Sequence, residues 1–426
     1  MYPKNILIVL PWLPYPLNSG GHQAIYNGIK AICNDINPII TYMINEDSYD
    51  QDICDEFITK INNHMVIEPF IVRNIKRGVI SSIIHHLHII LWKIKKNILF
   101  LVNKQIDSTI HFNISYRNWI DELLPKEESY LEHINYLIRK YNIEAVQCEM
   151  LGNCSIVTSI PKHIKKIFVH HEIGFIRNQQ ELDSKNNKDL LGKAFLESKK
   201  IQEIGLLNKY DGIITLSELD KNILEKSGVH VPIYSSIAIV NNIYKYKKIS
   251  ENYHILTFVG PEFHTPNALG IKWFLENCWL DLKEKDSSYI FNIIGNWSEA
   301  TQSYIIKEYK DIHFLGFVDD LSESLRNTIM IVPITVGSGI RMKILEAASI
   351  GVPIITTTIG VSGITMENEH HCLISDTPQD FINSIIKLKD KQIRLNLIEK
   401  AYNLIDKSYS MHALQENRLS IYKTIF

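Results

Sequence analysis

The chain has 426 residues, of which 45% are hydrophobic and 22% are charged, and its formal net charge at pH 7 is −2. This length exceeds the size at which a single hydrophobic core stops growing, so we expect two domains of an ordinary soluble globular protein. The near-neutral charge predicts no nucleic-acid partner. The six cysteines show neither a CxxC pair nor a Cys/His zinc spacing, which indicates reduced core thiols in a cytoplasmic protein.

The beginning of the chain carries an apolar run at residues 6–10 that is closed by Pro11. This run is too short for the hydrophobic region of a signal peptide and predicts a buried strand. No stretch of about 18 uninterrupted apolar residues occurs, so we expect no transmembrane helix.

Short runs rich in Ile and Val alternate with helical stretches along the whole chain. They lie at residues 6–10, 38–44, 65–72, 143–148, 166–171, 212–217, 254–260, 289–295, 312–317, 329–334, 352–357 and 371–376. Continuous apolar strands that alternate with helices are typical of parallel sheets covered on both faces. A polar run at residues 240–253 predicts a linker between two such α/β halves. We therefore expect an N-terminal domain over 1–245, a C-terminal domain over 246–405 and a final helix within 406–426.

Loops that follow the strands are the expected place for chemistry, because parallel sheets bind ligands at the carboxyl ends of their strands. After the first strand, Gly20 and Gly21 open a predicted helix and would let the backbone approach a ligand; the alternative is a plain tight turn. Glu149 follows the strand at 143–148 and is a candidate ligand-binding carboxylate or base. Two sheets that face each other would form a cleft. His170 and His171 end the next strand, where alternation points one ring toward that cleft and the other away. The alternative for this pair is a capped structural histidine.

The segment 72–104 contains seven Lys or Arg residues, no Asp or Glu, and many Ile and Leu residues. This composition suits contact with a membrane surface. It equally suits one or two helices that pack on the sheet and expose a basic face, and both interpretations stay open.

The run GSGIRMKILEAASIGVPIITT at residues 337–357 raises a question of charge. A strand, a Gly-containing loop and a helix over 340–350 are predicted there, with Gly351 and Pro353 ending the helix. Arg341 and Lys343 would then lie in the first helical turn, where the helix dipole disfavours cations. A diphosphate bound at this helix N-terminus would offset that cost. The alternative is two solvated surface cations, tolerated at a few tenths of a kcal/mol each.

This run resembles the donor-site signature of the family 4 retaining glycosyltransferases of the GT-B fold. The segments 210–224, 258–279, 313–321 and 357–364 are also similar to recurrent parts of that family. The resemblance implies an α/β GT-B fold, in which two Rossmann-like parallel-sheet domains face each other across a cleft. It further implies a nucleotide-sugar site made by Gly337, Ser338, Gly339, Glu346, Gly260, His264, Asn267, Gly360 and Gly363.

Individual roles follow from the same resemblance. Glu346 would bind the ribose hydroxyls, and Ser338 stands where much of the family has a glutamate that contacts the donor sugar. Lys343 and Arg341 would neutralise the diphosphate and count with His171, the cleft-facing histidine, as catalytic residues. The loop of Gly20 and Gly21, together with Glu149, would face the transferring sugar and the acceptor.

The resemblance implies front-face attack helped by the leaving diphosphate, with neither a metal nor a cofactor. The adjacent Asp319 and Asp320 lack the spacing of a DxD metal motif, which favours a solvated loop or a helix cap. We expect a retaining transferase that uses a glycan or lipid-linked glycan acceptor in bacterial surface polysaccharide synthesis. It would be cytoplasmic, with a peripheral contact at the inner membrane face if segment 72–104 supplies one.

Two rival functions remain open. One is a GT-B-fold nucleotide-sugar epimerase, and the other is a non-catalytic nucleotide- or glycan-binding homologue, which Ser338 suggests. A dinucleotide oxidoreductase fits poorly, because the glycines at 337 and 339 lack the third glycine of a GxGxxG run.

Overall fold

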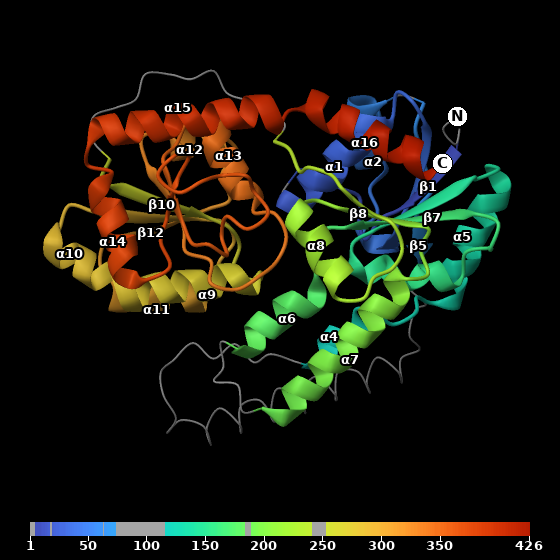
Figure 1. The fold of residues 1–426 in the computed structure, drawn as a ribbon, viewed down its shortest axis with the longest axis horizontal. Coiled ribbons are helices and arrows are strands. Elements are labelled where there is room, and N and C mark those ends of the chain that lie inside the picture. Colours follow the sequence, from blue (N-terminus) through green and yellow to red (C-terminus); the bar gives the residue numbers. More distant parts are fainter. Residues whose placement is uncertain (1–4, 18, 63, 74–115, 184–188, 241–252) are drawn as a thin grey trace.

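The computed structural model describes residues 5–17, 19–62, 64–73, 116–183, 189–240 and 253–426. Two parallel sheets form the centres of two α/β units that lie beside each other (Figure 1). The first is seven-stranded with the order β4-β2-β1-β6-β7-β8-β9, and the second is six-stranded with the order β12-β11-β10-β13-β14-β15.

The N-terminal unit contains the seven-stranded sheet and a small parallel pair, β3 and β5. Its strands are β1 (Asn5–Val9), β2 (Asn37–Thr41), β3 (Met43–Asn45), β4 (Val66–Ile67), β5 (Phe70–Val72), β6 (Ala145–Glu149), β7 (Lys165–His170), β8 (Gly212–Thr215) and β9 (Ile233–Ser235). Every predicted run of this unit contains a strand, but the runs 38–44 and 65–72 are each divided between the two sheets. In the second run Pro69 lies between β4 and β5, where it cannot donate to a strand ladder. The three-residue β9 was not predicted.

The helices of this unit cover the faces of the sheet. They are α1 (Gly20–Ile32), α2 (Gln51–Ile61), α4 (Tyr116–Asp121), α5 (Glu128–Lys140), α6 (Gly174–Asp183), α7 (Leu190–Leu207) and α8 (Glu218–Lys226), with the 3₁₀ turns η1 (Glu46–Ser48) and η2 (Leu151–Thr158). Ile6, Leu7 and Ile8 of β1 are fully buried, as covering on both faces requires.

The C-terminal unit repeats this plan. Its strands are β10 (Ile255–Val259), β11 (Ile290–Ile294), β12 (Ile312–Gly316), β13 (Ile329–Val332), β14 (Ile354–Thr356) and β15 (Leu373–Ile374). In Figure 1, α12 (Leu321–Leu325), α13 (Met342–Ile350) and α15 (Lys391–Ser408) lie on one side of the sheet, and α9 (Thr265–Phe274) and α11 (Glu299–Glu308) lie on the other. The remaining helical elements are the π-helical turn η3 (Leu275–Trp279), α10 (Leu280–Lys285) and α14 (Pro378–Lys387).

Each sheet reverses its strand order at one point in its interior. The reversal lies between β1 and β6 in the first sheet and between β10 and β13 in the second. The crevice outside the carboxyl ends of the strands at such a point is where open α/β sheets bind ligands. The loops after these four strands are therefore the place to examine.

The C-terminal helices join the two units. Helix α15 packs on α13, and after Tyr409 the chain continues into α16 (Met411–Ile425), which packs on α1 (Figure 1). Ser410 caps α16 by accepting a hydrogen bond from the Ala413 N–H.

Two sequence predictions fall on undescribed parts of the chain. The predicted boundary between residues 245 and 246 lies within 241–252, and residues 74–104 of the basic segment lie outside the described residues as well. Across the described ranges, every helix falls short of the length and apolar character that crossing a membrane requires.

Candidate functional site

Helix α13 begins two residues later than the sequence predicted. The sequence predicted a helix from residue 340, but the helix begins at Met342 and Arg341 is its N-cap residue. Positive φ angles of 123° at Gly337 and 78° at Gly339 turn the preceding loop. The Arg341 guanidinium folds back onto this loop and donates through Nη1 to the backbone oxygens of Ser338 and, at 2.6 Å, Gly339. The prediction that Arg341 lies in the first helical turn is therefore wrong.

Arg341 is buried with unused donors. Its exposed fraction is 8%, and its Nε and Nη2 atoms have no hydrogen-bond partner among the described residues. Burial lowers the pKa of Arg341, while the nearby Glu172 and Asp220 raise it. A solvated surface cation does not fit this burial. Buried donors without partners carry a free-energy cost that an anionic ligand at this position would remove.

Lys343 lies in the first turn of α13 and points toward the loop after β10. Its Nζ donates to Asn267 Oδ1 at 2.7 Å and lies 4.1 Å from the centre of the Phe258 ring. Burial, and then the neighbouring Arg341, lower the pKa of Lys343 to about 7. Gly260 permits this approach, because a Cβ atom there would lie 2.7 Å from Lys343 Nζ. The loop and the helix thus hold a side-chain amine that is only partly protonated at neutral pH.

Glu346 links the two units one helical turn further along α13. Its Oε1 accepts a hydrogen bond of 2.6 Å from Gln23 Nε2 on α1, and burial raises the pKa of its carboxyl. The N-terminal ends of α1 and α13 meet nearby, since a Cβ atom at Gly20 would lie 2.8 Å from Met342 Cγ. Gln23 could not be predicted, because a single polar residue in an amphipathic helix has no distinguishing pattern.

The glycine loop after β13 contacts the N-terminal unit through three consecutive residues. The Gly337 N–H donates to Gln180 Oε1, and Ser338 Oγ donates to the Ile173 backbone oxygen at 2.9 Å. A Cβ atom at Gly339 would lie 2.5 Å from the His171 backbone oxygen. Ser338, expected beside the donor sugar, thus directs its hydroxyl at the opposite unit in this structure.

The remaining predicted nucleotide-site residues lie around this loop. The Gly360 N–H donates to Thr357 Oγ1 at 2.8 Å. Gly363 has a φ angle of 80°, and a Cβ atom there would lie 3.1 Å from Ser217 of the N-terminal unit. His264 precedes α9, where its backbone oxygen accepts from the Asn267 N–H.

On the N-terminal unit, two predicted residues form a buried pair. His171 Nε2 lies 2.6 Å from Glu149 Oε2, and their side chains are 7% and 4% exposed. His170 points the other way and lies 3.3 Å from Glu203 Oε1, as strand alternation predicted. The pair thus joins the carboxyl ends of β6 and β7 beside the glycine loop.

The residue after Glu149 is strained. Met150 has φ 66° and ψ 149°, a backbone region that side chains other than glycine avoid at a cost of about 1–3 kcal/mol. A Cβ atom at Gly21 would lie 3.4 Å from Met150 Cε, so the strained turn touches the N-terminal glycine loop. A strained backbone conformation persists where the surrounding structure holds it in place. At Met150 this conformation sets the direction in which the chain leaves Glu149.

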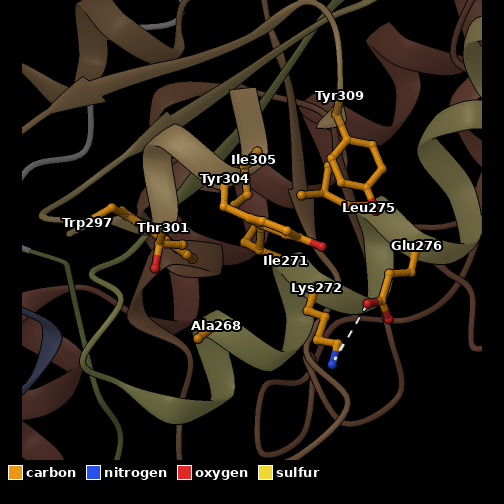
Figure 2. Close-up of a pocket in the computed structure, with 10 residues that line it drawn as sticks. All are labelled: Ala268, Ile271, Lys272, Leu275, Glu276, Trp297, Thr301, Tyr304, Ile305 and Tyr309. Atoms are coloured by element: carbon orange, nitrogen blue, oxygen red, sulfur yellow. Dashed lines mark ion pairs between the residues drawn. The ribbon is translucent and has the colours of Figure 1, made fainter. Parts of the chain in front are cut away.

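Asp320 and the pocket between α9 and α11 are two further candidates for a ligand site, and neither has the features of one. Throughout the described ranges, no three His, Cys, Asp or Glu side chains gather as metal ligands, and Asp320 caps α12 by accepting from the Ser322 N–H at 2.8 Å. The pocket between α9 and α11 in Figure 2 has a volume of about 10 Å³, which suits a single water molecule.

Comparison with known proteins bears on the fold and on the class of protein. Residues 253–391 match the family model described as "Glycosyl transferases group 1". Sucrose-phosphate synthase from Thermosynechococcus elongatus superposes with a TM-score of 0.71 at 13% identity, covering 99% of both chains. TarM superposes with a TM-score of 0.68 at 15% identity, covering 98% of both chains. The fold of the chain is therefore GT-B, and the matched domain together with these neighbours supports a glycosyltransferase enzyme.

Two further relatives bear on substrates. Anabaena HepE, solved in complex with UDP-glucose, superposes with a TM-score of 0.64 at 11% identity, covering 98% of this chain and 99% of that one. A curated relative, the uncharacterized 44.6 kDa protein in the cps region of Klebsiella pneumoniae, is 22% identical over 422 residues, covering 95% of this chain and 96% of its own length.

Proposed function

We propose that the protein is a retaining glycosyltransferase that moves a sugar from a nucleotide-diphosphate donor to a glycan or lipid-linked glycan acceptor. The observation that carries this proposal is the buried Arg341 guanidinium with two unpartnered nitrogens, beside Lys343 at the N-terminus of α13. The UDP-glucose complex of HepE and the match of residues 253–391 support it.

The donor diphosphate would take the position beside these cations at the N-terminal end of α13. An anion there satisfies Arg341, restores the proton of Lys343 and interacts favourably with the helix dipole. The same groups would stabilise the charge that grows on the leaving diphosphate, and they are already in place before the reaction. Catalysis would then consist of positioning and charge stabilisation, as in the front-face course that the resemblance implies.

The ribose hydroxyls would bind Glu346, whose carboxylate is occupied by Gln23 in this structure. Donor binding would therefore exchange a contact between the units for a contact with the ligand. His171 and Glu149, at the opposite wall, would hold the donor sugar or orient the acceptor hydroxyl. We propose no metal and no cofactor, consistent with a site made of cations and backbone N–H groups.

The cps-region relative supports a role in bacterial surface polysaccharide synthesis. We propose a cytoplasmic protein that meets its acceptor at the inner membrane face. The basic composition of segment 72–104 supports this last step.

The experiment that tests the proposal is a thermal-shift screen with UDP, GDP, CDP and dTDP sugars, followed by turnover of the stabilising donor. Nucleotide release that depends on an added lipid-linked glycan, with the donor's anomeric configuration kept in the product, supports the proposal. Donor conversion without acceptor indicates the epimerase, and binding with no turnover indicates the non-catalytic homologue. Binding of none of these donors overturns the proposed function.

A further inference from the structure

A buried chain of hydrogen bonds connects the C-terminal helix α16 to His171. Tyr422 on α16 donates its hydroxyl to Gln147 Oε1 on β6. Gln147 Nε2 donates to Glu149 Oε1 at 2.7 Å, and Glu149 Oε2 lies 2.6 Å from His171 Nε2. Tyr422, Gln147 and Glu149 are at most 3% exposed, so water does not compete for these bonds.

The direction of each bond in this chain is fixed by chemistry. Burial raises the pKa of Tyr422, so its hydroxyl keeps the proton and donates. The Gln147 amide then presents its oxygen to Tyr422 and its NH₂ group to Glu149. A carboxylate accepts hydrogen bonds, so with Glu149 in that form His171 is the donor through Nε2. In the neutral imidazole this leaves Nδ1 as an acceptor.

Packing alone does not account for a polar chain at this place. Gln147 lies in β6, whose residues are all buried, and apolar side chains would fill such a strand without the cost of burying an amide. A buried amide is tolerated when both of its ends have partners, and Tyr422 and Glu149 are those partners. The arrangement fixes one orientation of the Glu149 carboxylate, which in turn fixes one ring orientation and one tautomer of His171.

We propose that Tyr422 and Gln147 are positioning residues that act through Glu149 to hold His171 in the Nε2–H tautomer, so that α16 forms part of the site. Any effect on sugar transfer rests on the proposed function, whereas the effect on the histidine does not. Helix α15 packs on α13, where the sugar donor would bind, and continues into α16. The same pair of helices therefore supports both α13 and His171.

The test compares Tyr422→Phe with Tyr409→Phe. The first removes one hydroxyl from the chain and keeps the ring. The control removes the hydroxyl of a buried tyrosine between α15 and α16, which accepts from the Thr365 N–H at 2.9 Å and does not lead to His171. Gln147→Leu breaks the same chain at its second member and serves as an independent variant.

The first readout is the long-range ¹H–¹⁵N spectrum of the histidine rings, with the His171 signals assigned by their loss in His171→Ala. The wild type should show the Nε2–H tautomer. Tyr422→Phe and Gln147→Leu should shift the His171 tautomer signals or titration midpoint, while Tyr409→Phe leaves them unchanged. Signals in Tyr422→Phe identical to the wild type, or an equal shift in Tyr409→Phe, would overturn the proposal.

The second readout is the rate of sugar transfer. Losing one supporting hydrogen bond should lower kcat about 3- to 10-fold in Tyr422→Phe, with the KM for the donor within about twofold, and should move the pH–rate profile. A change in KM alone contradicts a positioning role. If no donor is turned over, the proposed function fails, and the spectra still decide whether the chain orients His171.

Discussion

Replacing Lys343 with methionine separates the diphosphate role of this residue from any role in folding. Methionine keeps much of the side-chain length over the Phe258 ring and removes the charge. A hydrogen bond to a charged group contributes about 1.5–3 kcal/mol, and about 1.4 kcal/mol corresponds to a tenfold change in affinity. We therefore expect Lys343→Met to weaken the binding of a nucleoside diphosphate about 10- to 150-fold.

Stability should respond much less than affinity. Because the pKa of Lys343 is about 7, the ligand-free protein at pH 8 already holds this side chain mostly neutral. The variant then loses the hydrogen bond to Asn267, which is worth about 0.5–1.5 kcal/mol, and gains by no longer burying an amine. A change of about 1 kcal/mol or less moves the Tm of a domain of this size by no more than about 4 °C.

Isothermal titration with UDP and the other nucleoside diphosphates, paired with a thermal melt, measures both quantities. The matched control is Lys272→Met, which removes the same charge from α9, where Lys272 Nζ lies 3.8 Å from Glu276 Oε1. The control should bind as the wild type does. A Lys343→Met protein whose affinity stays within twofold of the wild type would refute the assignment of Lys343 to the phosphates.

Three further outcomes follow. Diphosphate affinity should fall as pH rises above 7, because only the protonated amine of Lys343 attracts the anion. The fall should approach tenfold per pH unit until the pH reaches the pKa of Lys343 in the complex, which the bound anion raises. Lys343→Arg should flatten this profile in titrations between pH 7 and 9. His171→Ala should leave nucleoside-diphosphate affinity within about twofold and lower the transfer rate about 10²- to 10⁴-fold, and an equal loss in both would contradict a role at the sugar or acceptor. Gly339→Ala should lower the free energy of unfolding by about 1–3 kcal/mol in denaturant, because the residue has φ 78° and its Cβ would meet the His171 backbone oxygen. The control Gly205→Ala, with no atom within 4 Å of its Cβ, should be neutral or stabilising.

The strands could be predicted from sequence because each is a short apolar run with both faces buried. The runs 6–10 and 329–334 show this most clearly, since the residues of β1 and β13 are almost fully buried. The division of the run 65–72 between two sheets depends on which strands lie beside it, and that information lies elsewhere in the chain. The pattern of a single segment therefore predicts a strand but not its sheet.

The site was predictable where glycines and cations lie together in one segment, and not where polar residues meet across the units. Lys343 and Asn267 could be proposed from local motifs and the resemblance, and the structure brings them together. The direction of Arg341 depends on a two-residue difference in where α13 begins, which local propensity does not fix. Gln23 and Tyr422 lie on amphipathic helices, where only the tertiary structure distinguishes them from ordinary polar and core positions.

The most direct measurement of the central claim compares nucleoside diphosphates with their monophosphates. The terminal phosphate is the group that Arg341 and Lys343 would contact, so the tightest-binding diphosphate among UDP, GDP, CDP and dTDP should bind at least about tenfold more tightly than its monophosphate. Lys343→Met should remove most of that difference. Equal affinities for the diphosphate and the monophosphate would contradict the proposal that this buried pair of cations binds a diphosphate.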